Sequence, residues 1–233
     1  MENATPKRIL IVGGGFAGLT VAMELERKLG RDPSVEITLI NRENFFLFMP
    51  MLHEVAASDL DLTTIVNPVR KMLRRVNFLA GEVDQIDLEQ KRVVVSHGFD
   101  NHPHTLEFDF LVLGLGSITN TYGLPGVQEH ALTMKSLGDA MQVRNHLIAH
   151  LEEADSDCRG ETESLLTFVV AGGGFAGVET VAGINDFVRR ALRAYPHLSE
   201  DMVRVVLVHS GPVILPELEP GYLRSEDPRR TQG

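Results

Sequence analysis

The chain has 233 residues, and at roughly 150 residues per domain this length predicts one or two domains. Its hydrophobic content of 43% and charged content of 23% are typical of a globular protein and exclude a disordered chain. The net charge of −10 argues against DNA or RNA as a partner, because nucleic-acid binders present positive charge to the phosphate backbone. The single cysteine, Cys158, excludes an internal disulfide, a redox-active dithiol and a multi-cysteine metal site, and no metal site is predicted.

The first elements predicted along the chain form a β-α-β unit. A short apolar strand spans Arg8–Val12 and is too short for the core of a signal peptide, so secretion is not expected. Helical spacing of apolar residues follows over Phe16–Leu29, and a second strand spans Val35–Ile40. A crossover of this kind joins parallel strands. A short helix is then expected over Ile65–Val76, with its basic residues on a solvated face or, alternatively, in contact with phosphate.

The middle of the chain changes to a pattern of short strands. They are predicted over Glu82–Ile86, Arg92–Val95, Leu106–Phe108 and Phe110–Leu113, with Gly98–Thr105 as a hairpin loop. Three histidines lie in or beside this loop: His97, His102 and His104. Because no carboxylate or cysteine joins them at a fixed helical spacing, they are interpreted as surface residues rather than metal ligands.

A second β-α-β unit is predicted in the last third of the chain. In order, we expect a helix over Ser136–Leu151, a polar linker over Glu152–Glu163, a strand over Thr167–Ala171, a helix from Phe175 to about Tyr195, and a strand over Val203–Val208. The segment Leu165–Ile184 is apolar apart from Glu179. The glycines at its centre favour a buried strand, turn and helix over a membrane span.

The same hexapeptide, GGGFAG, occurs at residues 13–18 and 172–177, each time between a predicted strand and a predicted helix. This context is typical of a dinucleotide-binding G-x-G-x-x-G loop. In the first copy, Gly13 would permit the tight turn, Gly15 the close approach of a pyrophosphate, and Gly18 the packing of helix on strand. The same roles fall in the second copy to Gly172, Gly174 and Gly177. The helix N-terminus behind each loop would offer free N–H groups to the pyrophosphate.

The carboxylate that usually binds the ribose hydroxyls, about 20 residues beyond the glycines, is missing from both copies. Asn41 stands at this place in the first copy, and His209 followed by Ser210 in the second. Asn41 can bond a ribose hydroxyl but is neutral, so the residues alone do not decide between NAD and NADP. Two dinucleotide sites in one chain indicate a flavin and a nicotinamide, because hydride passes between these two rings.

Several further segments are distinctive: Asn44–Ala56, Phe108–Ser117, Tyr122–Gly126, Lys135–Ala140 and Gly177–Glu179. Together with the glycine loops, they resemble the two-dinucleotide-binding flavoprotein superfamily, and most of all the type II NADH dehydrogenases, which are single-subunit NADH:quinone reductases. The resemblance extends over about residues 7–220. It implies an α/β fold with two Rossmann-like units and a small antiparallel β-meander, the second unit being incomplete.

The resemblance also implies FAD in the first loop, NADH rather than NADPH in the second, and a quinone as electron acceptor. The implied FAD-site residues are Gly13, Gly15, Phe16, Ala17, Gly18, Asn41, Arg42, Pro50, Val83 and Gly116. The implied NADH-site residues are Gly172, Gly174, Phe175, Gly177, Glu179 and His209. Val83 would meet the adenine through its backbone. Glu179 would be catalytic, near the junction of flavin and nicotinamide; the alternative is a first-turn acid that only complements the helix dipole.

The predicted organisation is an FAD-binding domain over 1–155, an incomplete NAD(P)H-binding domain over 156–220 and an irregular tail over 221–233. A truncated or frame-altered end is expected, because the tail cannot form the strands with which the family continues. In the family, membrane contact belongs to a C-terminal region that is missing here. The expected location is the cytoplasm, or the cytoplasmic face of a membrane for a full-length member, and a homodimer stays open. Low activity is expected of this chain alone.

Two other interpretations stay open: a ferredoxin- or rubredoxin-reductase-like flavoprotein, and an inactive fragment that binds nucleotide weakly or not at all. The single cysteine argues against dithiol reductases and sulfide:quinone reductases, which need more than one. No cysteine lies within Asn41–Ala56, the region in which peroxidase-type relatives place theirs.

Overall fold

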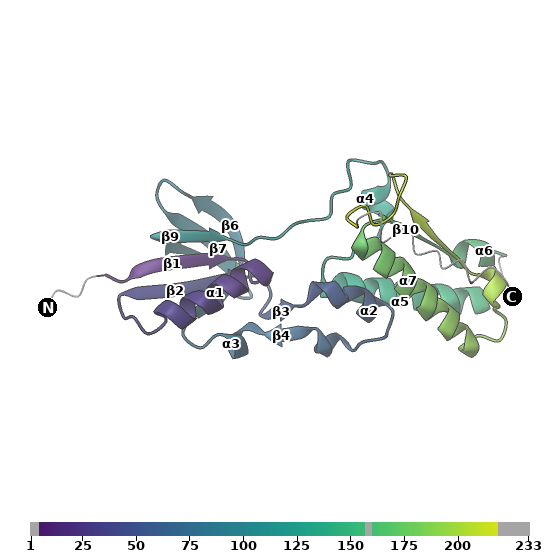
Figure 1. Ribbon diagram of the computed structural model, residues 1–233, viewed down its shortest axis with the longest axis horizontal. Helices are drawn as coiled ribbons and strands as arrows, with labels where there is room; N and C mark the ends of the chain where they lie inside the picture. Colours follow the sequence, from purple (N-terminus) through teal and green to yellow (C-terminus); the bar gives the residue numbers. More distant parts are fainter. Residues whose placement is uncertain (1–4, 157–159, 219–233) are drawn as a thin grey trace. The chain divides into compact units, whose positions relative to one another are not determined.

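The computed structural model describes residues 5–156 and 160–218, which divide into two compact units (Figure 1). Unit 1 comprises the chain up to Phe48 together with Thr63–Gly123, and unit 2 comprises Met49–Leu62 together with the chain from Leu124 onward. The predicted domains, 1–155 and 156–220, were defined by the cofactor that each would bind, and they stay predictions. Cys158 and the predicted tail over 221–233 lie outside the described residues.

Unit 1 is built on a four-stranded parallel sheet in the order β5-β2-β1-β9. Its strands are β1 (Lys7–Val12), β2 (Val35–Asn41), β5 (Asn77–Ala80) and β9 (Phe110–Leu113). Helix α1 (Phe16–Leu29) connects β1 to β2 and runs alongside both strands (Figure 1). The first predicted β-α-β unit is therefore confirmed, and with it the α/β fold class.

Alternating side chains of β1 and β2 pack against different layers on the two faces of this sheet. On one face, Ile11 and Leu39 pack with Leu19 of α1 and Val69 of the short helix α3 (Val69–Met72). On the opposite face, Leu10, Val12 and Ile40 pack with the valines of an antiparallel meander. The meander consists of β6 (Glu82–Asp87), β7 (Arg92–His97) and β8 (His102–Glu107). The predicted antiparallel meander is thus present and forms the third layer of unit 1.

The helix predicted over Ile65–Val76 is wrong for most of its length. Residues Val66–Pro68 form the short strand β4, which pairs antiparallel with β3 (Phe45–Leu47), and only Val69–Met72 is helical. Pro68 is the physical reason, because its ring fixes φ near −60°, removes an N–H donor and disfavours helix in the residue before it. A helix that runs through Pro68 is therefore disfavoured, and α3 begins directly after it.

The hairpin loop predicted over Gly98–Thr105 is also shorter than expected. Strand β8 already begins at His102 and pairs with β7 through Ser96 opposite Pro103 and His97 opposite His102. The turn is confined to residues 98–101, where Gly98 and Asn101 have positive φ values of 80° and 51°. Pro103 is tolerated because β8 is an edge strand of the meander.

Unit 2 combines two long helices, and a short helix that contacts both of them, with a two-stranded parallel sheet. The sheet pairs β10 (Thr167–Ala171) with β11 (Arg204–Val208), and α7 (Phe175–Ala191) connects them, as the second predicted β-α-β unit requires. Helix α2 (Leu52–Ala56) contacts both α5 (Leu137–Asp155) and α7. The remaining elements are α4 (Val127–His130), α6 (Thr162–Leu165) and the 3-10 turns Met49–Met51, Leu192–Ala194 and Glu200–Met202, while a further 3-10 turn, Leu62–Thr64, spans the boundary between the units.

Two helix ends in unit 2 differ from prediction. Helix α5 continues to Asp155, into the segment predicted as a linker, because the buried side chains of Leu151 and Ala154 extend its apolar face. Helix α7 ends at Ala191, and the following turn is 3-10 rather than α. The apolar stretch Leu165–Ile184 forms the end of α6, β10, a glycine turn and the start of α7. No helix within the described ranges is both long and apolar enough to cross a membrane.

Candidate functional site: two glycine loops

The first GGGFAG loop is closed by three glycines in mutual backbone contact. Gly13 has φ of +104°, and a Cβ on it would lie 2.2 Å from the carbonyl oxygen of Gly114. A Cβ on Gly18 would lie 1.7 Å from the carbonyl oxygen of Gly13. Gly114, which follows β9, is held by a hydrogen bond of 2.7 Å from its N–H to the carbonyl oxygen of Val12. Only glycine fits at Gly13 and Gly18, which agrees with the roles predicted for them.

Gly15 differs from its neighbours because a Cβ on it would meet no atom within 4 Å. It is the N-cap residue of α1, and its backbone is extended, with φ of −78° and ψ of −166°. Phe16 and Ala17 follow as exposed residues in the first helical turn, whose N–H groups have no acceptor within the helix. The loop therefore leaves open space at the one position where the sequence predicts a pyrophosphate, beside the partial positive charge of a helix N-terminus.

Phe16 also has aromatic neighbours in unit 1. Its ring lies edge-to-face with Phe46 of β3 and with Phe48, at centroid distances of 5.0 Å and 5.6 Å. This packing positions the side chain of the first helical residue against β3 and the residue that follows it. The aromatic segment Asn44–Ala56, singled out in the sequence, thus supports the first loop through its phenylalanines.

Asn41 lies at the end of β2, and its amide is bonded to the loop itself. Its Oδ1 accepts from the N–H of Gly14 at 2.7 Å, and its Nδ2 donates to the carbonyl oxygen of Glu43 at 2.8 Å. Asn41 was predicted to bind a ribose hydroxyl. The structure shows a backbone contact that the prediction did not include, while one lone pair on Oδ1 and one N–H remain for a ligand.

The second loop repeats the geometry of the first. Gly172 has φ of +124°, and a Cβ on Gly177 would lie 1.8 Å from the carbonyl oxygen of Gly172. Gly174 is the N-cap of α7 with extended backbone, and the exposed Phe175 begins the helix. His209, just after β11, accepts a hydrogen bond from the N–H of Gly173 at 3.2 Å on its Nδ1. His209 therefore occupies the same place in the second loop as Asn41 in the first.

The second loop is more enclosed than the first at its pyrophosphate position. A Cβ on Gly174 would lie 3.4 Å from Oε1 of Glu217, whereas the equivalent position at Gly15 is open. The segment that carries Glu217 is also bonded to the loop, because Leu215 N–H donates to the carbonyl oxygen of Gly173 at 2.6 Å. A carboxylate beside Gly174 would repel a diphosphate at this position.

The other predicted FAD-site residues are spread over both units. Arg42 is exposed and lies 3.9 Å from carboxylate oxygens of Glu43 and Glu82. Val83 is half-buried on β6 at a bulge in the β6–β7 pairing. Gly116 has φ of +72° and open space around its Cβ position. Pro50 lies in the 3-10 turn Met49–Met51, which belongs to unit 2.

Glu179 contacts a histidine that sequence reasoning did not single out. Its Oε2 lies 3.6 Å from Nδ1 of His53 on α2, close enough for an ion pair when the imidazole is protonated. The side chain of Glu179 is 47% exposed and that of His53 is 21% exposed. The alternative role of Glu179 as a first-turn acid is wrong, because α7 begins at Phe175 and its first turn contains no acidic residue. His53 lies within the segment Asn44–Ala56, and this was the available signal.

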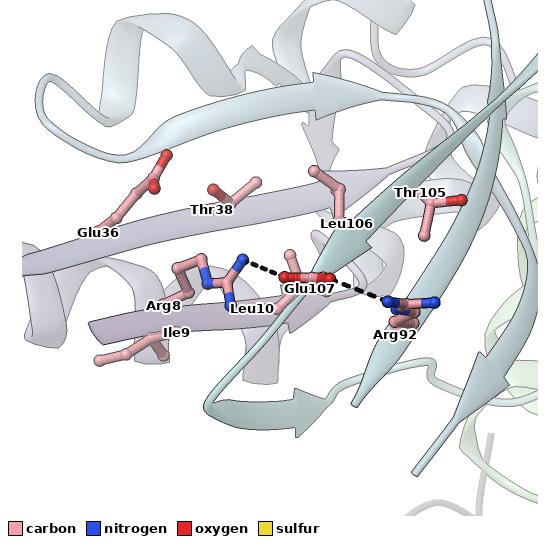
Figure 2. A pocket seen from close by; sticks show the side chains of 9 residues that line it. All are labelled: Arg8, Ile9, Leu10, Glu36, Thr38, Arg92, Thr105, Leu106 and Glu107. Carbon is pink, nitrogen blue, oxygen red and sulfur yellow. Dashed lines mark hydrogen bonds and ion pairs between the residues drawn. The ribbon is translucent and has the colours of Figure 1, made fainter. Parts of the chain in front are cut away.

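A pocket of about 630 Å³ lies elsewhere in unit 1, between β1, β2 and the strands β7 and β8 (Figure 2). Arg8 and Arg92 both contact Glu107 there, at 2.9 Å and 3.2 Å. The hydrogen bond from Arg8, together with the charges of both guanidinium groups, lowers the pKa of Glu107. Glu107 thus forms an ion pair with each of the two arginines that line the pocket. None of the residues that line this pocket was predicted to bind a cofactor. Among the described residues, no group of three or more histidine, cysteine or carboxylate side chains could hold a metal.

The comparisons with known proteins agree with this geometry. The chain is 33% identical over 218 residues to the External NADH-ubiquinone oxidoreductase 2, mitochondrial, of Saccharomyces cerevisiae, a match of 90% of this chain and 39% of that protein. It is 29% identical to the Type II NADH:quinone oxidoreductase of Staphylococcus aureus, over 90% of this chain and 50% of that protein. The chain thus spans half or less of the length of these relatives.

Solved structures show the same relationship. The structure of NDH2 from Plasmodium falciparum in complex with NADH matches with a TM-score of 0.83 and 25% identity, covering 92% of this chain and 44% of that one. These similarities confirm the resemblance to type II NADH dehydrogenases and the α/β fold that it implies. The family described as pyridine nucleotide-disulphide oxidoreductase matches residues 7–223, and this chain belongs to it.

Proposed function

We propose that the chain is the cofactor-binding part of an NADH:quinone oxidoreductase, with FAD in the first glycine loop and NADH in the second. The observation that carries this proposal is the recurrence of one hexapeptide with one backbone geometry, each time at a strand-to-helix turn. The relatives named NADH:quinone oxidoreductases support the choice of reaction.

The residues of the first loop fit a dinucleotide. Gly13 and Gly18 hold the turn in a form that no side chain would permit, and Gly15 leaves the space that a diphosphate needs. The N-terminus of α1 supplies unpaired N–H groups to the phosphate oxygens. Bound FAD would supply a two-electron acceptor for hydride, which the side chains of this chain do not offer. Arg42, Val83, Gly116 and Pro50 remain proposed members of this site.

The second loop is proposed to bind NADH in preference to NADPH. Gly172, Gly174 and Gly177 form the turn, and Phe175 begins the helix behind it. No arginine stands at the end of β11 to pair with a 2′-phosphate, and His209 already accepts a hydrogen bond from the loop. We expect a modest preference for NADH at pH 8, which the affinities for NADH and NADPH measure directly; a strong preference for NADPH would contradict it.

Glu179 is proposed as the catalytic residue of this reaction. Reduction of a quinone by NADH consumes one proton from solvent and gives NAD⁺ and the quinol. The contact between Glu179 and His53 provides two groups on unit 2 that can hold that proton, with Glu179 the more exposed of the two. His53 is proposed to orient the carboxylate.

The direct test is spectroscopic. The purified 233-residue chain should show the visible absorbance of bound flavin, and that absorbance should be bleached by NADH without oxygen. A chain that takes up no flavin, even after incubation with excess FAD, would contradict the assignment of the first loop. Flavin that stays oxidised in the presence of NADH would contradict the assignment of the second.

For the location, we propose the cytoplasm, or the cytoplasmic face of a membrane for a full-length relative. The quinone named in the relatives supports the membrane surface in this proposal, because an acceptor of this kind is reached there.

A further inference from the structure

Both glycine loops are bonded in the same way to the residue that ends the second strand. In the first loop, Gly14 N–H donates to Oδ1 of Asn41 at 2.7 Å. In the second loop, Gly173 N–H donates to Nδ1 of His209 at 3.2 Å. The N–H groups of Gly14 and Gly173 are thus each held by a side chain. The two side chains differ in one respect, because an amide does not titrate between about pH 5 and 8, whereas an imidazole can.

The imidazole of His209 is closely confined at this place. A Cβ on Gly173 would lie 2.5 Å from its Cγ, and a Cβ on Gly211 would lie 2.8 Å from its Nε2. The ring therefore lies between two residues that have no side chains. The other backbone group of Gly173 is also occupied, since its carbonyl oxygen accepts from Leu215 N–H at 2.6 Å. The segment after β11 holds Gly173 from both sides.

The direction of the hydrogen bond fixes the protonation of the ring. A backbone N–H is always a donor, so Nδ1 must accept, and the proton of the neutral imidazole lies on Nε2. An imidazolium donates from both nitrogens and leaves the N–H of Gly173 without an acceptor. Protonation of His209 therefore breaks the bond that fixes Gly173, while the equivalent bond to Asn41 is unaffected.

The strand β10 has no charged residue, and the first turn of α7 has no acidic one. The segment after β11 brings Glu217 to the loop, with its Oε1 3.4 Å from a Cβ position on Gly174. Glu217 is therefore the acidic group whose contribution has to be separated from that of His209.

We propose that His209 is a positioning residue for the second glycine loop: its unprotonated Nδ1 holds the N–H of Gly173, so that the loop is formed for a dinucleotide only while His209 is neutral. The proposal rests on the proposed function for its ligand, a nicotinamide dinucleotide. It assigns to His209 a role in the shape of the loop rather than in the choice between NADH and NADPH.

The first experiment follows the loop itself, without any nucleotide. In the ¹⁵N-labelled 233-residue chain, the amide resonance of Gly173 should shift in a single transition as the pH is lowered from about 8. In His209→Asn, which copies the residue of the first loop, the resonance should not move with pH. Gly14, bonded to Asn41, is the internal control and should stay constant in both proteins. Glu217→Gln should keep the transition of Gly173, since it leaves His209 in place.

The second experiment measures the affinity for NAD⁺, which is stable in acid. The wild type should bind about two- to tenfold more weakly at low pH than at pH 8, the effect of one lost hydrogen bond. His209→Asn should bind with equal affinity at both pH values, and within about twofold of the wild type at pH 8. His209→Ala should bind weakly at both, so that rescue by asparagine distinguishes positioning from loss of the ring.

The outcomes separate this inference from the proposed function. A Gly173 resonance that does not titrate in the wild type overturns the inference, whatever binds. Affinity for NADP⁺ that rises in acid while Gly173 stays still makes His209 a selectivity residue, which also overturns it. If Gly173 titrates in the wild type alone but neither dinucleotide binds at any pH, the positioning by His209 stands and the proposed function of the second loop falls.

Discussion

A side chain at Gly15 would meet open space, whereas one at Gly18 would meet backbone atoms. Substitutions at the two positions therefore distinguish an effect on flavin binding from an effect on folding. Gly15→Val places its side chain in open space, so we expect an intact fold, a loss of about 1 kcal/mol in helix stability from the poorer N-cap, and loss of flavin binding. Flavin absorbance after purification and the circular dichroism spectrum measure the two effects. A Gly15→Val chain with full flavin occupancy would show that the diphosphate does not lie there.

Gly18→Val is the matched control for this experiment. Its side chain would collide with the carbonyl oxygen of Gly13, so we expect the fold of unit 1 to fail and flavin binding to fail with it. A Gly18→Val chain as stable as the wild type would show that the fold does not require the close contact between Gly18 and Gly13.

At the scale of single elements, helix α5 illustrates how local sequence fixes an end. Ser136 is its N-cap and accepts from the N–H of Asp139, while the Asp139 carboxylate accepts from the N–H groups of Lys135 and Ser136. Burial alone would raise the pKa of Asp139, but these bonds and those from the hydroxyls of Thr133 and Ser136 lower it. The carboxylate is therefore favoured in the folded chain.

We expect Asp139→Ala to destabilise the chain by about 1 kcal/mol at pH 7. Because the folded pKa is lowered, the carboxylate stabilises the fold above its unfolded pKa, and this contribution is lost as the pH falls through the folded pKa. The difference between variant and wild type should accordingly shrink below about pH 4. Denaturant unfolding at both pH values measures it, with Glu153→Ala on the same helix as a control; an equal difference at the two pH values would contradict the capping role of the carboxylate.

The elements that sequence predicted well are those whose signals are local. The loop glycines, the apolar spacing of α1 and the alternation in β1 and β2 are all encoded within a few residues, and these elements have nearly their predicted ends. The predicted helix over Ile65–Val76 failed because Pro68 joined a strand pair, β3 with β4, whose partner lies far back in the sequence. The strand predicted over Leu106–Phe108 covers only the end of β8, because the first residues of β8, His102 and Pro103, are extended through their pairing with β7.

At the scale of the whole molecule, unit 2 leaves apolar strand surface uncovered. Within the described residues, β10 pairs only with β11, and Val169 and Val208 are 61% and 51% exposed. Open strand edges with apolar side chains favour association between chains. We expect the 233-residue chain to self-associate with rising concentration, and Val169→Lys to reduce this. Sedimentation velocity measures the effect; Phe99→Lys, at an exposed turn of the meander, is the control and should change little.

The same exposure leads us to expect low NADH:quinone activity from the chain alone. Hydride transfer requires both rings at close range, and small misplacement costs orders of magnitude in rate. Within the described residues, the second loop is carried by a sheet of two strands, and the chain spans half or less of the length of its relatives. Activity should rise when the chain is extended to the length of these relatives. Turnover at ordinary flavoenzyme rates by the 233-residue chain would contradict this expectation.

The sequence by itself determined the two glycine loops, the parallel β-α-β units that carry them and the family to which the chain belongs. These depend on glycine positions and on periodicity between near neighbours, which a linear pattern contains. Only the tertiary structure decided that Gly114 closes the first loop, that His53 contacts Glu179, and that His209 accepts a hydrogen bond from Gly173. Each of these contacts joins residues that are far apart in the chain, so no local sequence preference encodes it. The contact forms because the packing of helices on strands brings the two segments together.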